Sequence, residues 1–191
     1  MGFDDAYLGN PPWEISRPQS AFVDLESRGM IKSKILDSGC GTGENSIFLA
    51  KKGYDVLGID SAPRAIQKAR EKVAREELNV DFRVHDALDL RSLGKRFDTI
   101  IDSGLFHVFD DGDREKYIES VAGVLATGGS LHVLCFSDRE PGSWGPRRIQ
   151  EQVFHSSFKD NWRIERVAPA QFLTNMRPGY AKAWCASILK L

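Results

Sequence analysis

Apolar and polar positions along the chain fall into blocks that predict strands and helices in turn. Short apolar runs of strand length lie near residues 34–38, 54–59, 80–84, 97–102 and 129–136. The segments between them have helical spacing, in which apolar residues recur every three to four positions and form one face. Strands that alternate with helices are typical of a parallel sheet covered on both sides. The pattern therefore predicts an α/β protein with a doubly wound, Rossmann-like sheet.

The helical signals differ in how clearly their ends are marked. The first helix is expected near Ser20–Arg28, and residues 47–50 continue a helix that begins just before them. A third helix is predicted over Ala62–Glu76, and a fourth over Asp113–Ala126. Two glycines, Gly128-Gly129, are expected to end the fourth helix, because glycine is common just past a helix end. A strand must follow them.

The C-terminal part contains two neighbouring strand-like segments without a helix between them. Trp162–Val167 and Ala183–Leu189 are short and strand-like, and a loop with proline and glycine separates them. Two neighbouring strands joined in this way are expected to form an antiparallel pair. We place that pair at one edge of the sheet, which makes seven strands in all and leaves the sheet mostly parallel.

Composition limits the partners of the protein. The chain has 191 residues, and 26 basic against 27 acidic side chains give a net charge of −1, with no long basic run. Nucleic acid is therefore not an expected partner. The cysteines lack metal or redox spacing, so we expect reduced thiols and no metal. Since no apolar run approaches the roughly eighteen residues that span a bilayer, and the start resembles no signal peptide, we expect a cytoplasmic protein without a membrane partner.

The richest chemical signal is I-L-D-S-G-C-G-T-G at residues 35–43, followed by G-I-D at 58–60. It predicts a strand, a glycine turn, a helix, a second strand and then an acid. Glycine permits a tight turn and lets the backbone approach a ligand closely. Asp60 lies seventeen positions after Gly43, where a carboxylate accepts hydrogen bonds from both hydroxyls of a ribose. A glycine turn alone is often only a turn, and the acid makes the pattern specific.

The spacing of these residues also separates the nucleoside cofactors. A dinucleotide site needs a third glycine where this chain has Glu44. Instead Asp37 precedes a G-x-G-x-G run and offers a counter-ion to an ammonium group, which S-adenosylmethionine carries. At these residues the chain resembles the class I S-adenosylmethionine-dependent methyltransferases. The resemblance implies S-adenosylmethionine as cofactor, with contacts at Asp37, Gly39, Cys40, Gly41, Thr42, Gly43, Asp60 and Ser61.

Ligands of open parallel sheets bind beyond the carboxyl ends of the strands, so the loops there hold further candidates. After the third strand, Asp86 and Ala87 match the position at which the resembling family holds adenine. A second interpretation is that Asp86 caps a short helix, a common role of aspartate. The two roles are compatible.

The loop after the fourth strand, D-S-G-L-F-H-V-F at residues 102–109, is the expected catalytic segment. In the resembling family this loop faces cofactor and acceptor, which implies cofactor contacts for Asp102 and Ser103 and a substrate contact for Phe106. His107 can take a proton from the acceptor as a general base, because imidazole titrates near neutral pH. Alternatively it only packs the aromatic loop. The other histidines are expected to be structural: His85, His132 and His155.

The loop after the fifth strand, rich in glycine and proline, is expected to form a wall of the cleft. Trp144 offers a flat apolar surface to an aromatic acceptor, and Arg147 or Arg148 can bind an anionic group on it. The alternative is the start of a helix with one exposed arginine.

The N-terminal segment cannot join the sheet, but its composition suits a lid over the cofactor that excludes water. It contains Tyr7, the run P-P-W-E that includes Trp13, and Arg17, and we expect Trp13 and Arg17 to contact the cofactor. A disordered tail is the alternative. We divide the chain into residues 1–30, the lid segment and first helix, and residues 31–191, the S-adenosylmethionine-binding methyltransferase domain.

Three stretches narrow the resemblance: P-P-W-E-I-S-R-P-Q, D-S-G-L-F-H-V-F-D-D and L-C-F-S-D-x-E-P-G-x-W-G-P-R-R. They are similar to a bacterial branch of thiopurine and thiol methyltransferases, some of which methylate heterocyclic toxins such as hydroxyquinolones. The resemblance implies methyl transfer to oxygen, sulfur or nitrogen of a small aromatic or heterocyclic molecule. Two alternatives are a non-catalytic S-adenosylmethionine-binding regulatory module and a transferase that uses a decarboxylated cofactor or another nucleoside. The acceptor and the oligomeric state stay open.

Overall fold

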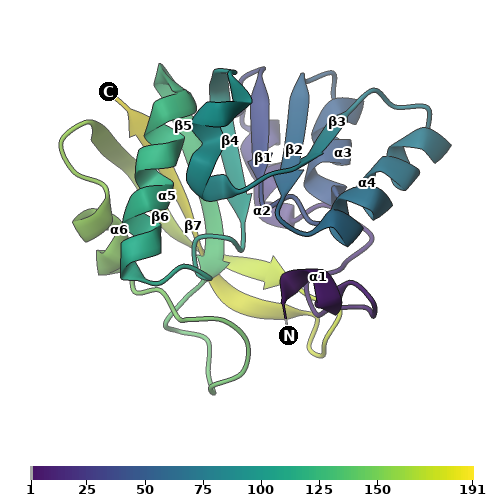
Figure 1. Ribbon diagram of the computed structural model, residues 1–191. Coiled ribbons are helices and arrows are strands. Elements are labelled where there is room, and N and C mark those ends of the chain that lie inside the picture. The colour runs from purple at the N-terminus through teal and green to yellow at the C-terminus, as the bar shows by residue number, and fades with distance from the viewer. Residues whose placement is uncertain (1) are drawn as a thin grey trace.

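A seven-stranded sheet with the order β3-β2-β1-β4-β5-β7-β6 forms the centre of the protein (Figure 1). The computed structural model describes residues 2–191, so Met1, the first residue of the expected lid segment, lies outside the described residues. Strands β1 to β5 are parallel, and β7 runs antiparallel to both β5 and β6. The predicted Rossmann-like sheet with an antiparallel edge pair is confirmed. The strands are β1 Ile35–Ser38, β2 Val56–Asp60, β3 Asp81–Val84, β4 Phe97–Ser103, β5 Leu125–Phe136, β6 Trp162–Leu173 and β7 Tyr180–Lys190.

Helices cover both faces of the sheet, and its central strands are therefore buried on both sides. Ile100 and Ile101 of β4 illustrate this, since adjacent strand residues point to opposite faces and both are fully buried. Ile100 packs in the cluster that includes α5 and α6, whereas Ile101 packs with α2 and α3. The helical elements are α1 Phe3–Ala6, α2 Ser20–Ser27, α3 Glu44–Lys51, α4 Pro63–Arg75, the 3₁₀ helix η1 Ala87–Leu93, α5 Asp111–Val124 and α6 Glu151–Ser157.

The boundary between α5 and β5 differs from the prediction. The helix ends at Val124 and the strand begins at once, so Gly128 and Gly129 lie inside β5 rather than at a helix end. Phe97 pairs with Leu125 but Thr99 pairs with Ser130, which leaves extra residues bulged out of the ladder. Gly128 has a positive φ of 75° there. The two glycines therefore serve a bulge, which the sequence pattern alone did not distinguish from a helix stop.

The C-terminal hairpin is also longer than predicted. Strands β6 and β7 extend to Leu173 and from Tyr180, beyond the expected bounds of 162–167 and 183–189. Pro169 lies within β6, which tolerates it because an edge strand has amides that need no partner. This extension carries the turn between the two strands to the carboxyl edge of the parallel strands.

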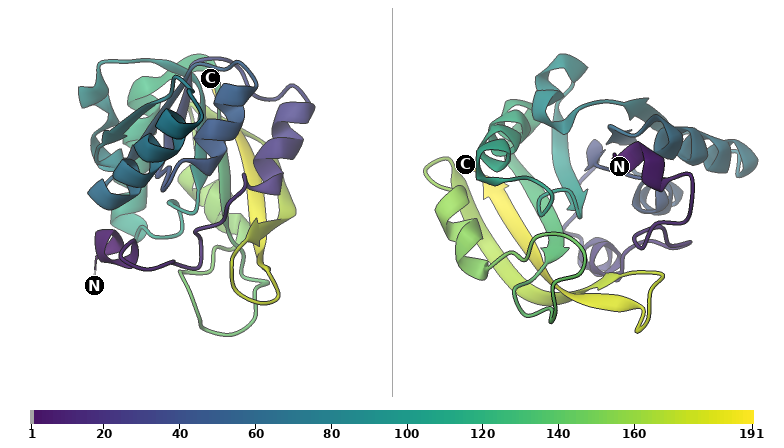
Figure 2. Two further views of the ribbon diagram at one scale, coloured as in Figure 1. Left: turned by 90° about the vertical axis from the view of Figure 1, so that its right-hand side faces the viewer. Right: turned by 60° about the horizontal axis from the view of Figure 1, so that its bottom comes forward.

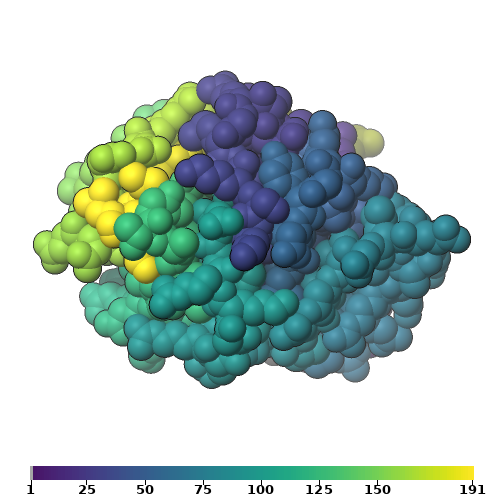
Figure 3. Space-filling model, turned by 90° about the horizontal axis from the view of Figure 1, so that it is seen from above, coloured from purple at the N-terminus to yellow at the C-terminus, as the bar shows by residue number. Residues whose placement is uncertain are grey.

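Three segments that are distant in the sequence surround that carboxyl edge. Figure 2 (right) brings it forward and shows the N-terminal segment, the loop between β5 and α6, and the β6–β7 turn around it. The opposite face, at the amino ends of the parallel strands, is seen in Figure 3 and carries the C-terminal residues. Across residues 2–191, none of the helices is both long enough and apolar enough to pass through a membrane.

Candidate active site

A cavity of about 980 Å³ lies at the carboxyl edge of the parallel strands. Its walls come from the glycine turn after β1, from the ends of β2 and β4, from the loop after β5 and from the N-terminal segment. The predicted residues that line it are Trp13, Arg17, Gly39, Cys40, Gly41, Thr42, Asp60, Ser61, Asp86, Ala87, Ser103, His107 and Trp144. The structure thus brings most of the predicted site into one space.

Neighbouring side chains of the protein restrict the glycine turn. Gly41 has a φ of 55°, and a Cβ on it would lie 3.0 Å from the hydroxyl of Tyr7. At Gly43, where φ is 87°, a Cβ would lie 2.6 Å from Cζ of Phe82. Gly43 does not line the cavity, and the structure shows a packing role for it. It lets α3 pack closely against the ring from β3, which the spacing of the motif did not specify.

Asp60 connects the end of β2 to the glycine turn. Its Oδ2 accepts a hydrogen bond from the amide of Gly41 at 2.9 Å, and its Oδ1 accepts one from the amide of Ala62 at 2.8 Å. Burial raises the pKa of this carboxyl, although the backbone amides oppose the shift. Each carboxylate oxygen has a further lone pair, so the group can accept additional hydrogen bonds from a ligand in the cavity.

Two other acids, Asp37 and Asp102, are fully buried at the ends of β1 and β4 and do not line the cavity. Asp37 Oδ2 accepts a hydrogen bond from Ser46 Oγ at 2.6 Å, and Asp102 Oδ1 accepts from the amides of Leu105 and Phe106. Asp37 Oδ1 and Asp102 Oδ2 have no partner among the described residues. Burial raises the pKa of each carboxyl to about 7. Because an unpaired buried carboxylate is costly, burial favours the protonated form of both groups in the ligand-free protein.

The N-terminal segment is attached to the glycine turn on one side and to the β6–β7 turn on the other. Trp13 Nε1 donates a hydrogen bond to Tyr7 Oη at 3.1 Å, and Thr42 Oγ1 donates to Glu14 Oε1 at 2.8 Å. Asn175 Nδ2, in the β6–β7 turn, donates to the carbonyl of Glu14 at 3.1 Å. These contacts contradict a disordered tail. Tyr7 and Glu14 also line the cavity, although no motif indicated a contact for them.

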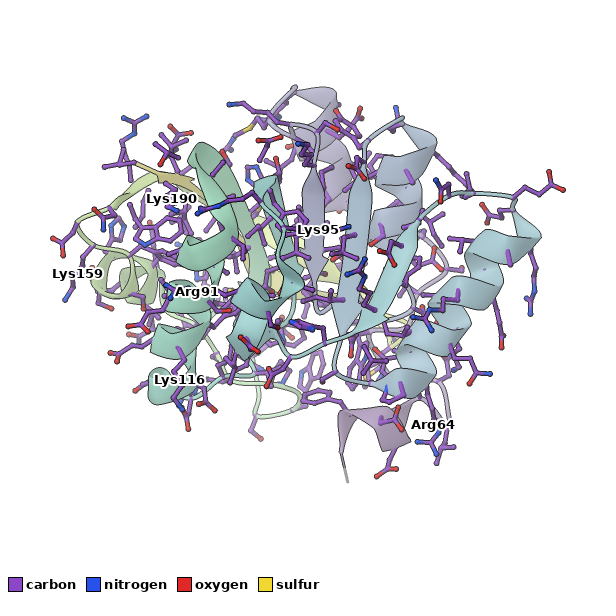
Figure 4. All side chains as sticks on the ribbon, turned by 45° about the horizontal axis from the view of Figure 1, so that its top comes forward. Arg64, Arg91, Lys95, Lys116, Lys159 and Lys190 are labelled. Atoms are coloured by element: carbon purple, nitrogen blue, oxygen red, sulfur yellow. The ribbon has the colours of Figure 1, made fainter. Side chains whose placement is uncertain are left out.

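Further contacts hold the two ends of this segment. Gln19 exchanges two hydrogen bonds with the backbone of Leu173, at 2.8 and 3.0 Å. Asp4 in α1 accepts a hydrogen bond from the amide of Arg64 at 2.8 Å and forms an ion pair with its side chain. Figure 4 shows Arg64 at the start of α4 beside α1. The segment therefore covers the cavity through contacts to elements on both sides.

Asp86 and His85 follow β3 at the same edge. Asp86 Oδ1 accepts a hydrogen bond from the amide of Leu88 at 2.9 Å and so caps η1. It also lines the cavity, as does His85, whose Nε2 lies 2.9 Å from the carbonyl of Asp89. His132 does not line the cavity, and its ring nitrogens lie within hydrogen-bond distance of Ser187 Oγ and the carbonyl of Met30. His155 lies in α6.

His107 is the buried histidine of the cavity wall. Its Nδ1 accepts a hydrogen bond from the amide of Phe136 at 2.9 Å, and its ring packs between Phe136 and Phe172. Burial, together with the nearby charge of Arg148, lowers its pKa to about 3. Its one lone pair is already used and its basicity is low. In this geometry Nδ1 is not free to take a proton from an acceptor, and the structure favours the neutral ring.

Two residues expected to bind substrate lie elsewhere. The ring of Phe106 is fully buried and stacks on Phe154 and Phe158, with centroids 5.4 and 6.1 Å apart. Arg147 is exposed and forms an ion pair with Asp111 at 2.7 Å. Neither lines the cavity, so the structure does not bring these two residues together with the rest of the predicted site.

The apolar end of the cavity is built from residues that the motifs did not identify. Beside the predicted Trp144, the large apolar side chains there are those of Val108, Phe109, Phe136, Phe172 and Met176. Phe109 shares the expected loop, but its residue type does not distinguish it from the buried Phe106 three positions earlier. The residues from β6 and the following turn had no usable signal in the sequence, since only tertiary contacts bring them here.

Arg148 organises the loop that carries Trp144. Its guanidinium donates hydrogen bonds to the carbonyls of Trp144 and Pro146, both at 2.7 Å, and to that of Glu140 at 3.3 Å. It also lies over the rings of Phe136 and Trp144, at 5.3 and 5.7 Å from their centroids. Its donors are thus largely committed to the loop, rather than free for an anionic substrate.

Comparisons with known proteins agree with this geometry. Residues 35–129 match a family profile described as a methyltransferase domain. The 2-heptyl-1-hydroxyquinolin-4(1H)-one methyltransferase of Mycobacteroides abscessus is 33% identical over 184 residues, which cover 91% of this chain and 81% of that protein. Two solved structures are also similar to this chain.

One of them was reported under the words "Conversion of a Disulfide Bond into a Thioacetal Group during Echinomycin Biosynthesis". It has a TM-score of 0.90 and 34% identity, covering 98% of this chain and 91% of that one. The second is the 1,6-didemethyltoxoflavin-N1-methyltransferase of Burkholderia thailandensis, solved with S-adenosylhomocysteine. It shares the fold, with a TM-score of 0.70 and 17% identity over 90% of this chain and 76% of that one.

Proposed function

The chain belongs to the S-adenosylmethionine-dependent methyltransferases, and on that premise we propose that it methylates an oxygen, sulfur or nitrogen of a small, flat, largely apolar acceptor. One observation carries the proposal. A single cavity runs from the glycine turn and Asp60 at one end to aromatic side chains such as Trp144 at the other. These two ends suit a nucleoside and an aromatic molecule held side by side.

The residues at the glycine-turn end fit the cofactor. Asp60 has lone pairs for the ribose hydroxyls, and the unpaired Oδ1 of Asp37 supports a counter-ion role toward the ammonium group. Asp86 and Ala87 are proposed to hold the adenine, and Arg17 the carboxylate end. When bound, S-adenosylmethionine supplies a methyl group activated by a positively charged sulfur.

Cys40, Thr42, Ser61 and Ser103 complete the proposed cofactor contacts, since each lines the same part of the cavity. Asp102 does not, and we propose that it contributes through the amides that it holds at the start of the loop after β4. We further propose that residues 1–30 form a lid and that Trp13 closes it over the cofactor. A closed lid removes water from the reaction and keeps the reactants aligned.

Two relatives and the aromatic end of the cavity support the proposed class of acceptor. One relative acts on a hydroxyquinolone, and a second is a structure tied to disulfide and thioacetal chemistry. Phe109, Trp144 and Phe172 offer flat surfaces that suit a heterocycle. Positioning the acceptor against the methyl group is the main contribution of such a site, and ideal alignment lowers a barrier by about 7 to 11 kcal/mol.

The test is transfer of a labelled methyl group from S-adenosylmethionine to a panel of phenols, thiols and N-hydroxy heterocycles, alongside calorimetry with S-adenosylhomocysteine. We expect binding of the nucleoside and turnover of at least one class. Binding without turnover of any class would favour the regulatory module. Absence of binding would contradict the cofactor assignment itself.

A further inference from the structure

The hydrogen bond to His107 determines where its proton lies. The amide of Phe136 can only donate, and it donates to Nδ1 at 2.9 Å. Nδ1 therefore contributes the lone pair. A neutral imidazole has one N–H, so Nε2 carries the proton. This tautomer gives the ring a donor and leaves it no acceptor for a second partner.

The Nε2–H group faces the cavity. His107 lines the cavity, and no described residue forms a hydrogen bond with Nε2, which is also absent from the polar atoms sealed in the interior without a partner. Gly104 keeps the space beside this nitrogen open, because a Cβ there would lie 3.3 Å from Nε2. The donor is thus available to a molecule bound in the cavity.

The surroundings of His107 favour an anion rather than a proton to be removed. The charged group beside the ring is Arg148, whose positive charge lowers the pKa of His107. The two acids that line the cavity beside this loop each use Oδ1 within the protein, since Asp110 Oδ1 accepts from the amide of Asp113 and Asp113 Oδ1 binds Lys116 Nζ, both at 2.8 Å. A hydrogen-bond donor and a cation therefore lie beside this loop, and among the described residues no carboxylate forms a hydrogen bond with the His107 ring.

We propose that His107 donates a hydrogen bond from Nε2 to the acceptor and that the acceptor reacts as an anion. This inference rests on the proposed function and specifies its substrate class. The acceptors are acidic groups that ionise near or below neutral pH, such as N-hydroxy heterocycles, thiols and electron-poor phenols. The anion's lone pair forms the new bond to the methyl carbon while the carbon–sulfur bond breaks and its electron pair returns to sulfur. The proton has already passed to water, so none moves in this step.

Two substitutions separate a donor from a base. His107→Gln keeps an N–H near the position of Nε2, whereas His107→Leu removes it. With 4-nitrophenol, 4-nitrothiophenol and 2-heptyl-1-hydroxyquinolin-4(1H)-one as acceptors, we expect the leucine variant to lose about tenfold to a hundredfold in kcat/KM. The glutamine variant should stay within about threefold of the wild type, because a neutral amide donates nearly as well as a neutral imidazole. Calorimetry with S-adenosylhomocysteine should give the same affinity for both.

A matched control is His132→Gln, which alters a second buried neutral histidine away from the cavity. It should leave kcat/KM unchanged, which would show that replacing a buried histidine by glutamine does not by itself reduce activity. The second readout needs no turnover. With S-adenosylhomocysteine-saturated protein, the visible absorption of 4-nitrophenolate gives the pKa of the bound phenol, which the leucine variant should raise by about one to two units.

The outcomes distinguish a failure of the donor role of His107 from a failure of the proposed methyltransferase function. If the wild type transfers methyl groups but the glutamine and leucine variants lose activity equally, or if the bound phenol is neutral, the donor role is wrong and the methyltransferase stands. If the wild type binds S-adenosylhomocysteine and methylates none of the probes, the proposed function fails and the inference falls with it.

Discussion

Gly43 gives the sharpest test of how the glycine turn is built. Its φ of 87° is in the left-handed region, and a Cβ on it would lie 2.6 Å from Cζ and 2.9 Å from Cε1 of Phe82. The ring of Phe82 is 1% exposed, so it has little room to move. For Gly43→Ala, the backbone conformation costs about 1 to 2 kcal/mol. Overpacking adds about 1 to 3 kcal/mol, which gives a total loss of about 2 to 5 kcal/mol.

Gly53→Ala is a matched control in the same part of the fold. Gly53 has a φ of 90°, but a Cβ on it would meet nothing within 4 Å. It should therefore lose only the conformational part, about 1 to 2 kcal/mol. Urea denaturation measures both losses, and each kcal/mol corresponds to a fall of about 2 to 4 °C in Tm for a chain of this length.

A double variant isolates the contact itself. Phe82→Leu shortens the ring, so it should cost less in the Gly43→Ala background than in the wild type, giving a favourable coupling in a double-mutant cycle. Equal stability of the two alanine variants, or no coupling with Phe82→Leu, would refute the claim that α3 and β3 approach too closely for any side chain at this position.

Three further predictions concern the cavity. Asp60→Ala should weaken binding of S-adenosylhomocysteine by about 1 to 3 kcal/mol in calorimetry, because its carboxylate oxygens are lost, and unchanged affinity would remove it from the cofactor site. Arg148→Met should raise KM for the acceptor and alter Trp144 fluorescence, since three loop carbonyls lose their donor, whereas the exposed Arg147→Met should change both little. For Asp37, burial raises the folded pKa from 3.8 to about 7, so between these values the folded protein holds a proton that the unfolded chain has lost. Stability of the ligand-free protein should then fall as pH rises from 4 to 7, and Asp37→Asn should flatten that fall in Tm measurements; an unchanged slope would contradict the assignment.

The order of elements was readable because it depends on short-range patterns. The buried parallel strands appear as apolar runs, and the G-x-G-x-G turn with Asp60 places the first two strands and the helix between them. The end of α5 was misread for a local reason. A glycine pair ends a helix or fills a bulge equally well, and the choice was made by the register of β5 against β4.

The site was readable only in part. Most predicted residues of the glycine turn and the strand ends line the cavity, since adjacency to a strand end follows from topology, but Asp37, Gly43 and Asp102 do not. The side chains of one loop were not separable in this way. Phe106 and Phe109 are the same residue type three positions apart, yet the first is buried in the core and the second lines the cavity.

By itself the sequence determined the sheet, its cofactor turn and the family, because hydrophobic periodicity, glycine conformation and an acid at a strand end act over short distances. Only the tertiary structure decided what each side chain does at the acceptor end. His107 is a donor because Phe136, far along the chain, presents an amide to its Nδ1. Such a contact depends on how distant strands pack, and packing has no local signature in the order of residues.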